Sequence, residues 1–285
     1  MSMMIEDAAS KTTDINVLMR QGHVYVADVE RLCLELLEQH CRRRASPRVL
    51  EIGCASGLTS QRLAELLPHA TITAQEEYAP FAALARQRLS TTRVGLHEGS
   101  LATLAGTFDV ILSAGAHHHL PSGYLDEVKA LLRTGGVFVL ADEFCPEYST
   151  AEERAHIAGA PLIHLANGYV LTSASEVEDY TSHKRLPARA RQMEASRRRA
   201  LWHWYRYVVD EAMRGDHVEV AIAELQSAHD DLITGEASEH KLAPSVLERQ
   251  LALGGFSVLR KHVFGPIDDP SLHSIMAYEV AAAER

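Results

Sequence analysis

Short apolar segments alternate with amphipathic helical patterns along the first half of the chain. Between the first two segments, Leu63, Leu66 and Leu67 recur at the spacing that places side chains on one face of a helix. The apolar segments have the length of buried strands and lie at residues 48–53, 70–74, 94–97, 108–113 and 137–141. Five such alternations predict parallel βαβ units with right-handed crossovers, and therefore a doubly wound α/β sheet.

The pattern changes after residue 142. Residues 146–243 show no convincing strand and much helical periodicity, and strand-like segments return at residues 255–260 and 273–278. We therefore predict a seven-stranded sheet with a helical insertion between strands five and six. The predicted parts are an N-terminal arm or lid (1–28), a core (29–145), an insertion that serves as a lid or substrate domain (146–243), and a C-terminal helix with antiparallel strands that complete the core (244–285).

Composition narrows the class of protein and its partners. The 285 residues are 46% hydrophobic and 23% charged, as in globular proteins, and a formal net charge of −10 disfavours nucleic acid as a partner. No run approaches the roughly 18 apolar residues that span a bilayer, and residues 1–14 lack the apolar core of a signal peptide. We therefore expect a cytoplasmic protein with no membrane partner. The four cysteines show neither zinc-binding nor disulfide spacing.

The loop after the first predicted strand carries the most informative motif. Glu51, Gly53 and Gly57 lie in the segment EIGCASG, whose small residues let a ligand approach the backbone at the N-terminus of the next helix. Glycines in such a loop can also serve only to turn the chain. About 25 residues further on, Glu76 follows the second strand, where an acid in a Rossmann-like unit hydrogen-bonds a ribose diol. The alternative for Glu76 is a cap on a surface loop.

Together these segments resemble the class I S-adenosylmethionine-dependent methyltransferases. The resemblance implies that Glu51 lies near the amino-acid part of S-adenosylmethionine and that Gly53 and Gly57 line its loop. It also implies that Glu76 binds the ribose of this cofactor. The resemblance extends over residues 29–145 and 244–282, so the expected architecture is the Rossmann-like methyltransferase sheet.

Later segments match further motifs of this family, at residues 99–101, 108–113 and 118–120. The resemblance implies that Ser100 and Leu101 lie beside the adenine. Ser113, at the end of the fourth strand, and Tyr25, which could close over the site, complete the predicted cofactor-binding set. Two residues depart from the family pattern, because Ala55 replaces the middle glycine of the loop and Ser100 replaces an acid. A slightly wider loop can accommodate Ala55, and Ser100 can still hydrogen-bond the adenine amine.

Polar side chains at the ends of the fourth and fifth strands are candidates for the chemistry. His118 and His119 lie where a substrate is expected, and either could act as a general base at neutral pH or simply pack below the cofactor. Asp142 could orient an amine or hydroxyl nucleophile, or cap the next helix. Ser113 could position an amine. Consecutive histidines cannot all point to one ion and no acid has a matching spacing, so we predict no metal site.

Two side-chain clusters stand out in the predicted insertion. The run WHWYRY at residues 202–207 concentrates aromatic faces, which attract a sulfonium or ammonium but more often form a helix–helix core. Basic residues gather between residues 184 and 199. A solvated helix face is the simpler interpretation of these, and recognition of a carboxylate-bearing substrate or an acidic partner is the alternative.

Three functions remain open from the sequence. The first is S-adenosylmethionine-dependent methyl transfer to a small-molecule metabolite, by direct SN2 displacement in a pocket closed by the insertion. The second is a methyltransferase-like enzyme of the azetidine-2-carboxylate synthase type. Such an enzyme cyclises or transfers the 3-amino-3-carboxypropyl arm of S-adenosylmethionine and releases methylthioadenosine, so the cofactor itself is the substrate. The third is a non-catalytic cofactor-binding scaffold. A homodimer is left open, because the insertion could be a lid or an interface.

Overall fold

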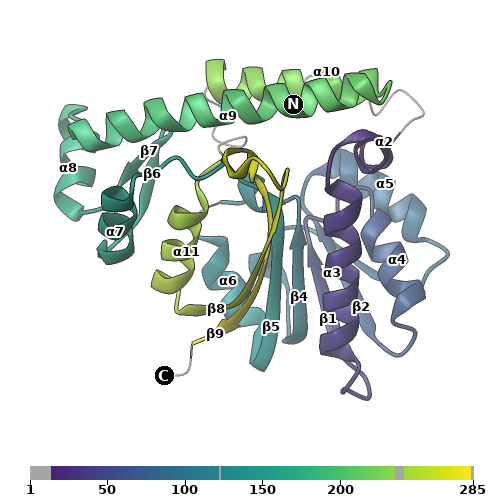
Figure 1. Cartoon of the computed structure of the whole chain (residues 1–285). Coiled ribbons are helices and arrows are strands. Elements are labelled where there is room, and N and C mark those ends of the chain that lie inside the picture. Colours follow the sequence, from purple (N-terminus) through teal and green to yellow (C-terminus); the bar gives the residue numbers. More distant parts are fainter. Residues whose placement is uncertain (1–13, 122, 235–240, 284–285) are drawn as a thin grey trace.

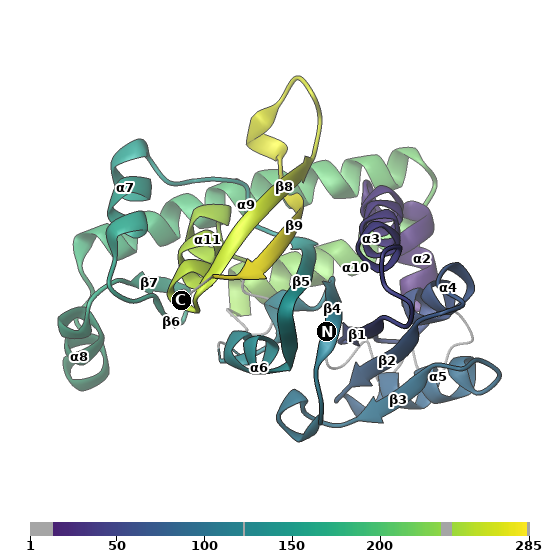
Figure 2. The same cartoon turned by 90° about the horizontal axis from the view of Figure 1, so that it is seen from below.

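Seven strands form a single sheet in the computed structural model, which describes residues 14–121, 123–234 and 241–283. The strands are β1 (Arg48–Ile52), β2 (Thr71–Glu76), β3 (Gly95–Glu98), β4 (Phe108–Ala114), β5 (Leu132–Glu143), β8 (Phe256–Phe264) and β9 (Ile275–Ala282). Their order is β3-β2-β1-β4-β5-β9-β8 (Figures 1 and 2). β1 to β5 pair in parallel, whereas β9 runs antiparallel to both β5 and β8. The predicted doubly wound, seven-stranded α/β sheet is confirmed.

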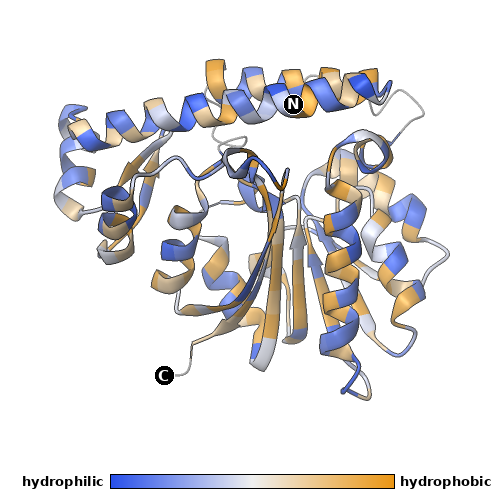
Figure 3. Ribbon diagram, viewed as in Figure 1, coloured by the Kyte–Doolittle hydropathy of each residue, from blue (hydrophilic) through white to orange (hydrophobic). Residues whose placement is uncertain are grey.

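Helices cover both faces of this sheet. The covering helices are, on one face, α3 (Val26–Cys41), α4 (Leu58–Leu66) and α5 (Ala79–Leu89) and, on the other, α6 (Tyr124–Leu131) and α11 (Pro244–Leu253). Successive strand residues point to opposite faces, so Val49 packs in the core under α3 and Leu50 in the core under α6. The central strands are accordingly apolar along their length (Figure 3). Burial on both faces explains why continuous apolar segments mark the strands in the sequence.

The segment from residue 146 to residue 243 is mostly helical but contains two strands. Its elements are α7 (Ala151–Gly159), β6 (His164–Ala166), β7 (Tyr169–Leu171), α8 (Ala174–His183), α9 (Ala188–Arg214), α10 (Val218–His229) and the π-helical turn η3 (Asp230–Thr234). β6 and β7 form a separate antiparallel hairpin, joined by Asn167 and Gly168, which both have positive φ. The expectation of no strand in this range was therefore wrong. Three-residue strands are too short to show alternation, although an Asn-Gly pair is a hairpin signal.

The long helices of this segment lie over one end of the sheet. Figure 1 shows α9 and α10 across the end at which the parallel strands finish. From the N-terminal side, α2 (Ile15–Gly22) packs against them, with Leu18 and Met19 beside Ala212 of α9 and Val220 of α10. Residues 1–13 of the predicted arm lie outside the described residues. The carboxyl ends of the strands are therefore covered by elements from two distant parts of the chain.

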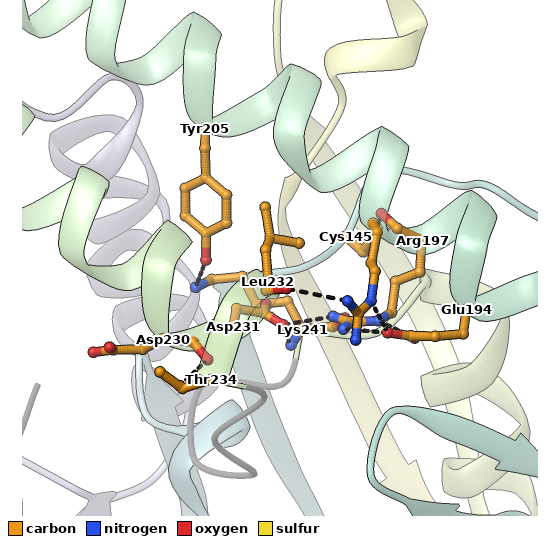
Figure 4. Close-up of polar contacts among 10 residues, drawn as sticks. Cys145, Glu194, Arg197, Tyr205, Asp230, Asp231, Leu232, Thr234 and Lys241 are labelled. Carbon is orange, nitrogen blue, oxygen red and sulfur yellow. Dashed lines mark hydrogen bonds and ion pairs between the residues drawn. The ribbon is translucent and has the colours of Figure 1, made fainter.

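A buried ionic network fixes α9 to the rest of the molecule (Figure 4). Arg197 is 1% exposed and donates hydrogen bonds of 2.7 Å each to Glu194 and Asp231. Its backbone oxygen lies 3.7 Å from the Sγ of Cys145, just after β5. Nearby, the Lys241 ammonium donates to the hydroxyl of Tyr205 at 2.7 Å. The interpretation of the basic cluster as a solvated face is thus wrong for Arg197, which anchors the helix from inside.

The surface carries an apolar stripe on α10. Val218, Ile222 and Leu225 of α10 are 41%, 47% and 50% exposed, at a spacing that aligns them along one face of the helix. None of the helices that the structure describes is both long and apolar enough to cross a bilayer. A homodimer stays a prediction.

Candidate cofactor and acceptor site

The loop between β1 and α4 has an unusual backbone. Gly53, Ala55 and Gly57 adopt left-handed conformations, with φ of 62°, 48° and 77°. A Cβ at Gly53 would lie 2.6 Å from the Cβ of Ala116, in the loop after β4, so these two loops meet without room for a side chain. Ala55 adopts the same conformation despite its Cβ, which costs about 1–2 kcal/mol. The loop leads into α4, and backbone N–H groups at the N-terminus of a helix can bind a ligand.

Two polar residues at the end of β2 hold this loop in place. Gln75 accepts from the backbone N–H of Gly53 at 3.1 Å and donates to the backbone oxygen of Gly99 at 2.8 Å. Glu76 accepts from the N–H groups of Ala55 at 2.8 Å and Tyr78 at 2.9 Å, one on each carboxylate oxygen. A carboxylate can accept more hydrogen bonds than these two, so Glu76 could also accept one from a ribose hydroxyl. Sequence reasoning missed the tethering role of Gln75, although a polar residue at the end of a buried strand was a usable signal.

Glu51 is the second carboxyl group of this region. Its side chain is 3% exposed and accepts a hydrogen bond from the hydroxyl of Ser60. Burial, together with the nearby charges of Glu30 and Glu76, raises the pKa of Glu51 to about 8 against the opposing effect of the Ser60 hydrogen bond. Burial also raises the pKa of Glu76, against hydrogen bonds from the N–H groups of Tyr78 and Ala55. A buried carboxyl of this kind is stabilised in its charged form by a cation placed next to it.

Ser100 and Leu101 lie at the end of β3, where Ser100 caps a 3-10 turn through a 3.4 Å bond from the N–H of Ala102. The Leu101 side chain is buried in the core under α6, so only its backbone can border a ligand. Ser113 is fully buried, pairs in register with Ile52 of β1, and thus lies beside the Gly53 loop. Its Oγ has no hydrogen-bond partner among the residues that the structure describes. Buried hydroxyls usually have a hydrogen-bond partner, and a polar group of a ligand could supply one to Ser113.

Tyr25 connects the N-terminal segment to the helices above the sheet. It precedes α3 with a φ of 64°, a left-handed conformation that is rare for a bulky residue. Its hydroxyl lies 3.3 Å from the hydroxyl of Tyr207 on α9. The structure therefore places Tyr25 under the long helix, in contact with one member of the aromatic run that the sequence singled out.

Asp142 and His118 form a close pair at the ends of β5 and β4. The Asp142 Oδ1 lies 2.8 Å from the His118 Nδ1, and the Oδ2 accepts the backbone N–H of His118 at 3.1 Å. Burial alone would raise the pKa of Asp142, but the charge and hydrogen bond of His118 hold it well below its usual value. An ionised Asp142 accepts a proton-bearing Nδ1, so Nε2 is the ring atom of His118 that can take up a proton.

The two histidines beside His118 have different environments. The Nδ1 of His117 lies 2.7 Å from the hydroxyl of Tyr124, and burial lowers the pKa of His117 to about 4. His117 is therefore neutral near pH 7 and ties the loop to α6. His119 is exposed, and its ring centroid lies 3.8 Å from that of His118. Within the described ranges, the carboxylate of Asp142 orients the ring of His118.

Comparison with known proteins agrees with this arrangement. A family model described as a methyltransferase domain matches residues 49–136, which run from β1 into β5 and include the Gly53 loop, Glu76 and His118. The chain carries a class I S-adenosylmethionine-dependent methyltransferase domain. The sequence-based resemblance to this family is confirmed.

The methyltransferase domain has relatives of several kinds. A malonyl-[acyl-carrier protein] O-methyltransferase of Bacillus cytotoxicus is 26% identical over 162 residues, which cover 54% of this chain and 57% of that protein. A probable phthiotriol/phenolphthiotriol dimycocerosates methyltransferase of Mycobacterium ulcerans is 32% identical over 125 residues, or 42% of this chain and 48% of that protein. The chain thus spans about half the length of these relatives.

A solved structure, that of the CurJ carbon methyltransferase, shares the fold. Its TM-score is 0.54 at 14% identity, over 95% of this chain and 59% of that one. At this level of identity, the likeness concerns the arrangement of strands and helices alone. It includes nearly the whole chain, and so the segment above the sheet as well as the methyltransferase domain.

Proposed function

We propose that this chain transfers the methyl group of S-adenosylmethionine to a small molecule whose acceptor oxygen or nitrogen carries a proton. The observation that carries this proposal is the Asp142–His118 pair at the carboxyl ends of β5 and β4. Ligands of open α/β sheets bind at this end of the strands. Transfer to a protonated acceptor must release a proton, and the Nε2 of His118 is positioned to take it while Asp142 holds the ring.

The described residues fit the cofactor at several points. Glu51 offers a buried carboxyl for its ammonium, Glu76 offers carboxylate oxygens for its ribose, and Ser113 offers an unpartnered hydroxyl. Ser100 is the candidate for the adenine amine. When bound, S-adenosylmethionine supplies a methyl group on an electrophilic sulfonium. The protein then contributes mainly alignment of the acceptor and exclusion of water.

The elements above the sheet favour a small acceptor over a macromolecule. α9 and α10 cover the strand ends, and the ionic network around Arg197 fixes α9 there. One relative is an O-methyltransferase, which agrees with oxygen as an acceptor atom. An acceptor enclosed between these helices and the sheet would be shielded from water.

Replacing Glu51 with Gln tests the assignment of the cofactor's ammonium. The raised pKa of about 8 means that folded Glu51 keeps its proton between its ordinary pKa of 4.5 and pH 8, so its contribution to stability falls as pH rises through this window. We expect Glu51→Gln to be more stable than the parent protein at pH 8 by roughly 2–4 kcal/mol, with little difference near pH 4.5. At the same time, it should bind S-adenosylmethionine roughly 10–100-fold more weakly, because a charged hydrogen-bond partner is lost. Thermal unfolding across pH and calorimetric titration measure both, and unchanged affinity would remove Glu51 from the site.

A second reaction is favoured by one observation, the unpartnered hydroxyl of Ser113. Next to the Gly53 loop, this hydroxyl could accept a hydrogen bond from the cofactor's own amine and direct it toward its γ-carbon. Attack there would close a four-membered ring, break the carbon–sulfur bond and release methylthioadenosine, with one amine proton passing to a base. The chain would then need no acceptor.

One incubation separates these reactions. The purified chain is mixed with S-adenosylmethionine alone, and then with a panel of small alcohols, acids and amines, and products are followed by mass spectrometry. S-adenosylhomocysteine that appears only with an acceptor supports methyl transfer. Methylthioadenosine with a cyclic amino acid and no acceptor supports ring closure instead. Binding of the cofactor with neither product would support a scaffold and overturn both proposals.

A further inference from the structure

Three side chains from distant parts of the sequence converge between the sheet and the helices above it. His23 follows α2, Glu143 ends β5, and Glu224 belongs to α10. One nitrogen or oxygen atom from each lies within 4.8 Å of the others. The His23 Nε2 is 3.5 Å from a Glu224 oxygen and 3.8 Å from a Glu143 oxygen. His23 and Glu224 are buried, and Glu143 is nearly so.

The ring of His23 is oriented toward the two carboxylates. Its Nδ1 lies 2.7 Å from the backbone oxygen of Val24, which can only accept, so Nδ1 carries a hydrogen and Nε2 faces the glutamates. His23 is 95% buried, since only 5% of its surface is exposed. Its Nε2 makes no hydrogen bond within the described part of the chain. Separations of 3.5 and 3.8 Å are too long for a direct N–H···O bond.

These separations fit a shared ion. Imidazole and carboxylate ligands lie roughly 2.0–2.2 Å from a metal such as zinc, so neighbouring ligand atoms are roughly 3.0–3.6 Å apart. An ammonium held by three acceptors at about 2.8 Å would instead need them roughly 4.5 Å apart. The 3.5 Å separation of His23 and Glu224 falls in the first range, and the 3.8 Å separation of His23 and Glu143 lies just outside it. The two His23 separations therefore fit a metal ion better than an amine, and the Glu143 and Glu224 oxygens lie within 4.8 Å of each other.

The groups around the three side chains also suit a metal. Ligating histidines donate their other ring N–H to a backbone oxygen or carboxylate, as His23 does to Val24. Ligating carboxylates are themselves hydrogen-bonded, and the indole N–H of Trp204 donates to Glu143 at 2.5 Å. That contact uses one Glu143 oxygen and leaves the other facing His23.

We propose that His23, Glu143 and Glu224 bind one divalent transition-metal ion. A set of one imidazole and two carboxylates suits zinc, manganese, iron(II) or cobalt(II), and three protein ligands leave coordination positions for water or for an acceptor oxygen. Glu143 directly follows Asp142 at the carboxyl end of β5. The ion would therefore lie at the same end of the strands as His118. It would also bind α2 and α10 to β5. The site does not depend on which reaction the chain catalyses.

Metal binding to the full chain, without an affinity tag and stripped with a chelator, tests the proposal. We expect ZnCl2 or MnCl2 to bind at one equivalent by calorimetry and to raise the thermal midpoint, since an ion that binds only the folded state stabilises it. His23→Gln and Glu224→Gln should lose at least about 100-fold in affinity. Trp204→Phe should lose roughly 10–100-fold, because it removes only the support of Glu143.

Matched controls come from the same chain. His40→Gln removes another histidine that contacts a glutamate, at 2.7 Å from Glu279, and Trp202→Phe removes an exposed tryptophan of the same helix. Both should keep the parent affinity. No saturable binding by the parent chain, or equal binding by the ligand variants, would overturn the site.

If a ligand variant fails to fold, an absorption spectrum of the parent chain with bound cobalt(II) tests the ligand set instead. Nitrogen and oxygen ligation gives no sulfur-to-cobalt charge-transfer band, and the described cysteines are all free thiols. A bound ion without that band supports the histidine–glutamate site. Such a band would move the metal to a cysteine and refute the proposal.

Discussion

Replacing His118 with Asn is expected to lower kcat for methyl transfer by roughly 10²–10⁴-fold, the usual contribution of a positioned general base. The amide cannot take up the acceptor's proton, although it can still hydrogen-bond Asp142. Binding of S-adenosylmethionine, measured by calorimetry, should change little, because the loop, Glu51 and Glu76 are untouched. The measurement is the rate of S-adenosylhomocysteine formation with an acceptor identified by the panel.

The matched control is His262→Asn. His262 also contacts a carboxylate, at 3.3 Å from Glu279, but it lies on β8, which β9 separates from the strand that carries Asp142. It should retain the parent rate. A loss below about tenfold for His118→Asn would mean that the acceptor needs no base at this position, and proton transfer by His118 would have to be abandoned.

Replacing Arg197 with Met is expected to destabilise the chain by roughly 3–5 kcal/mol, the usual cost of removing one partner from a buried ion pair. The change leaves Glu194 and Asp231 buried without the guanidinium that both accept from. Denaturant unfolding followed by circular dichroism measures this loss. Arg199→Met is the control, because Arg199 is exposed on the same helix and should change stability by less than about 0.5 kcal/mol. A cost for Arg197→Met below about 1 kcal/mol would show that the network does not hold α9 in place.

The sheet could be predicted because each strand and helix is specified by a hydrophobic pattern within one short segment of the sequence. Strands buried on both faces must be apolar along their length, as β1 and β4 largely are, and helices follow β1, β2 and β4 in the chain. The β1 loop was found for a similar reason, since left-handed positions at Gly53 and Gly57 call for glycine. Ala55 shares that left-handed conformation although it carries a Cβ.

The contacts between candidate residues could not be read from the sequence. His118 and Asp142 were chosen separately, and their pairing depends on β4 and β5 being neighbours in the sheet. Arg197 looked solvated because it belongs to a basic run, and only the packing of η3 against α9 buries it. His23, Glu143 and Glu224 belong to three elements whose placement is tertiary, so no spacing along the chain relates them.

The position of β9 has a consequence for how the chain folds. β9 lies between β5 and β8, yet it follows the other six strands of the sheet in the chain and comes after the whole segment from residue 144 to residue 274. Until it arrives, β5 is an open edge with unpaired backbone groups, which can pair with another chain. Contacts so distant in sequence also form slowly. The nascent five-stranded half is therefore the stage at which this chain is most exposed to aggregation, and the return of β9 ends that stage.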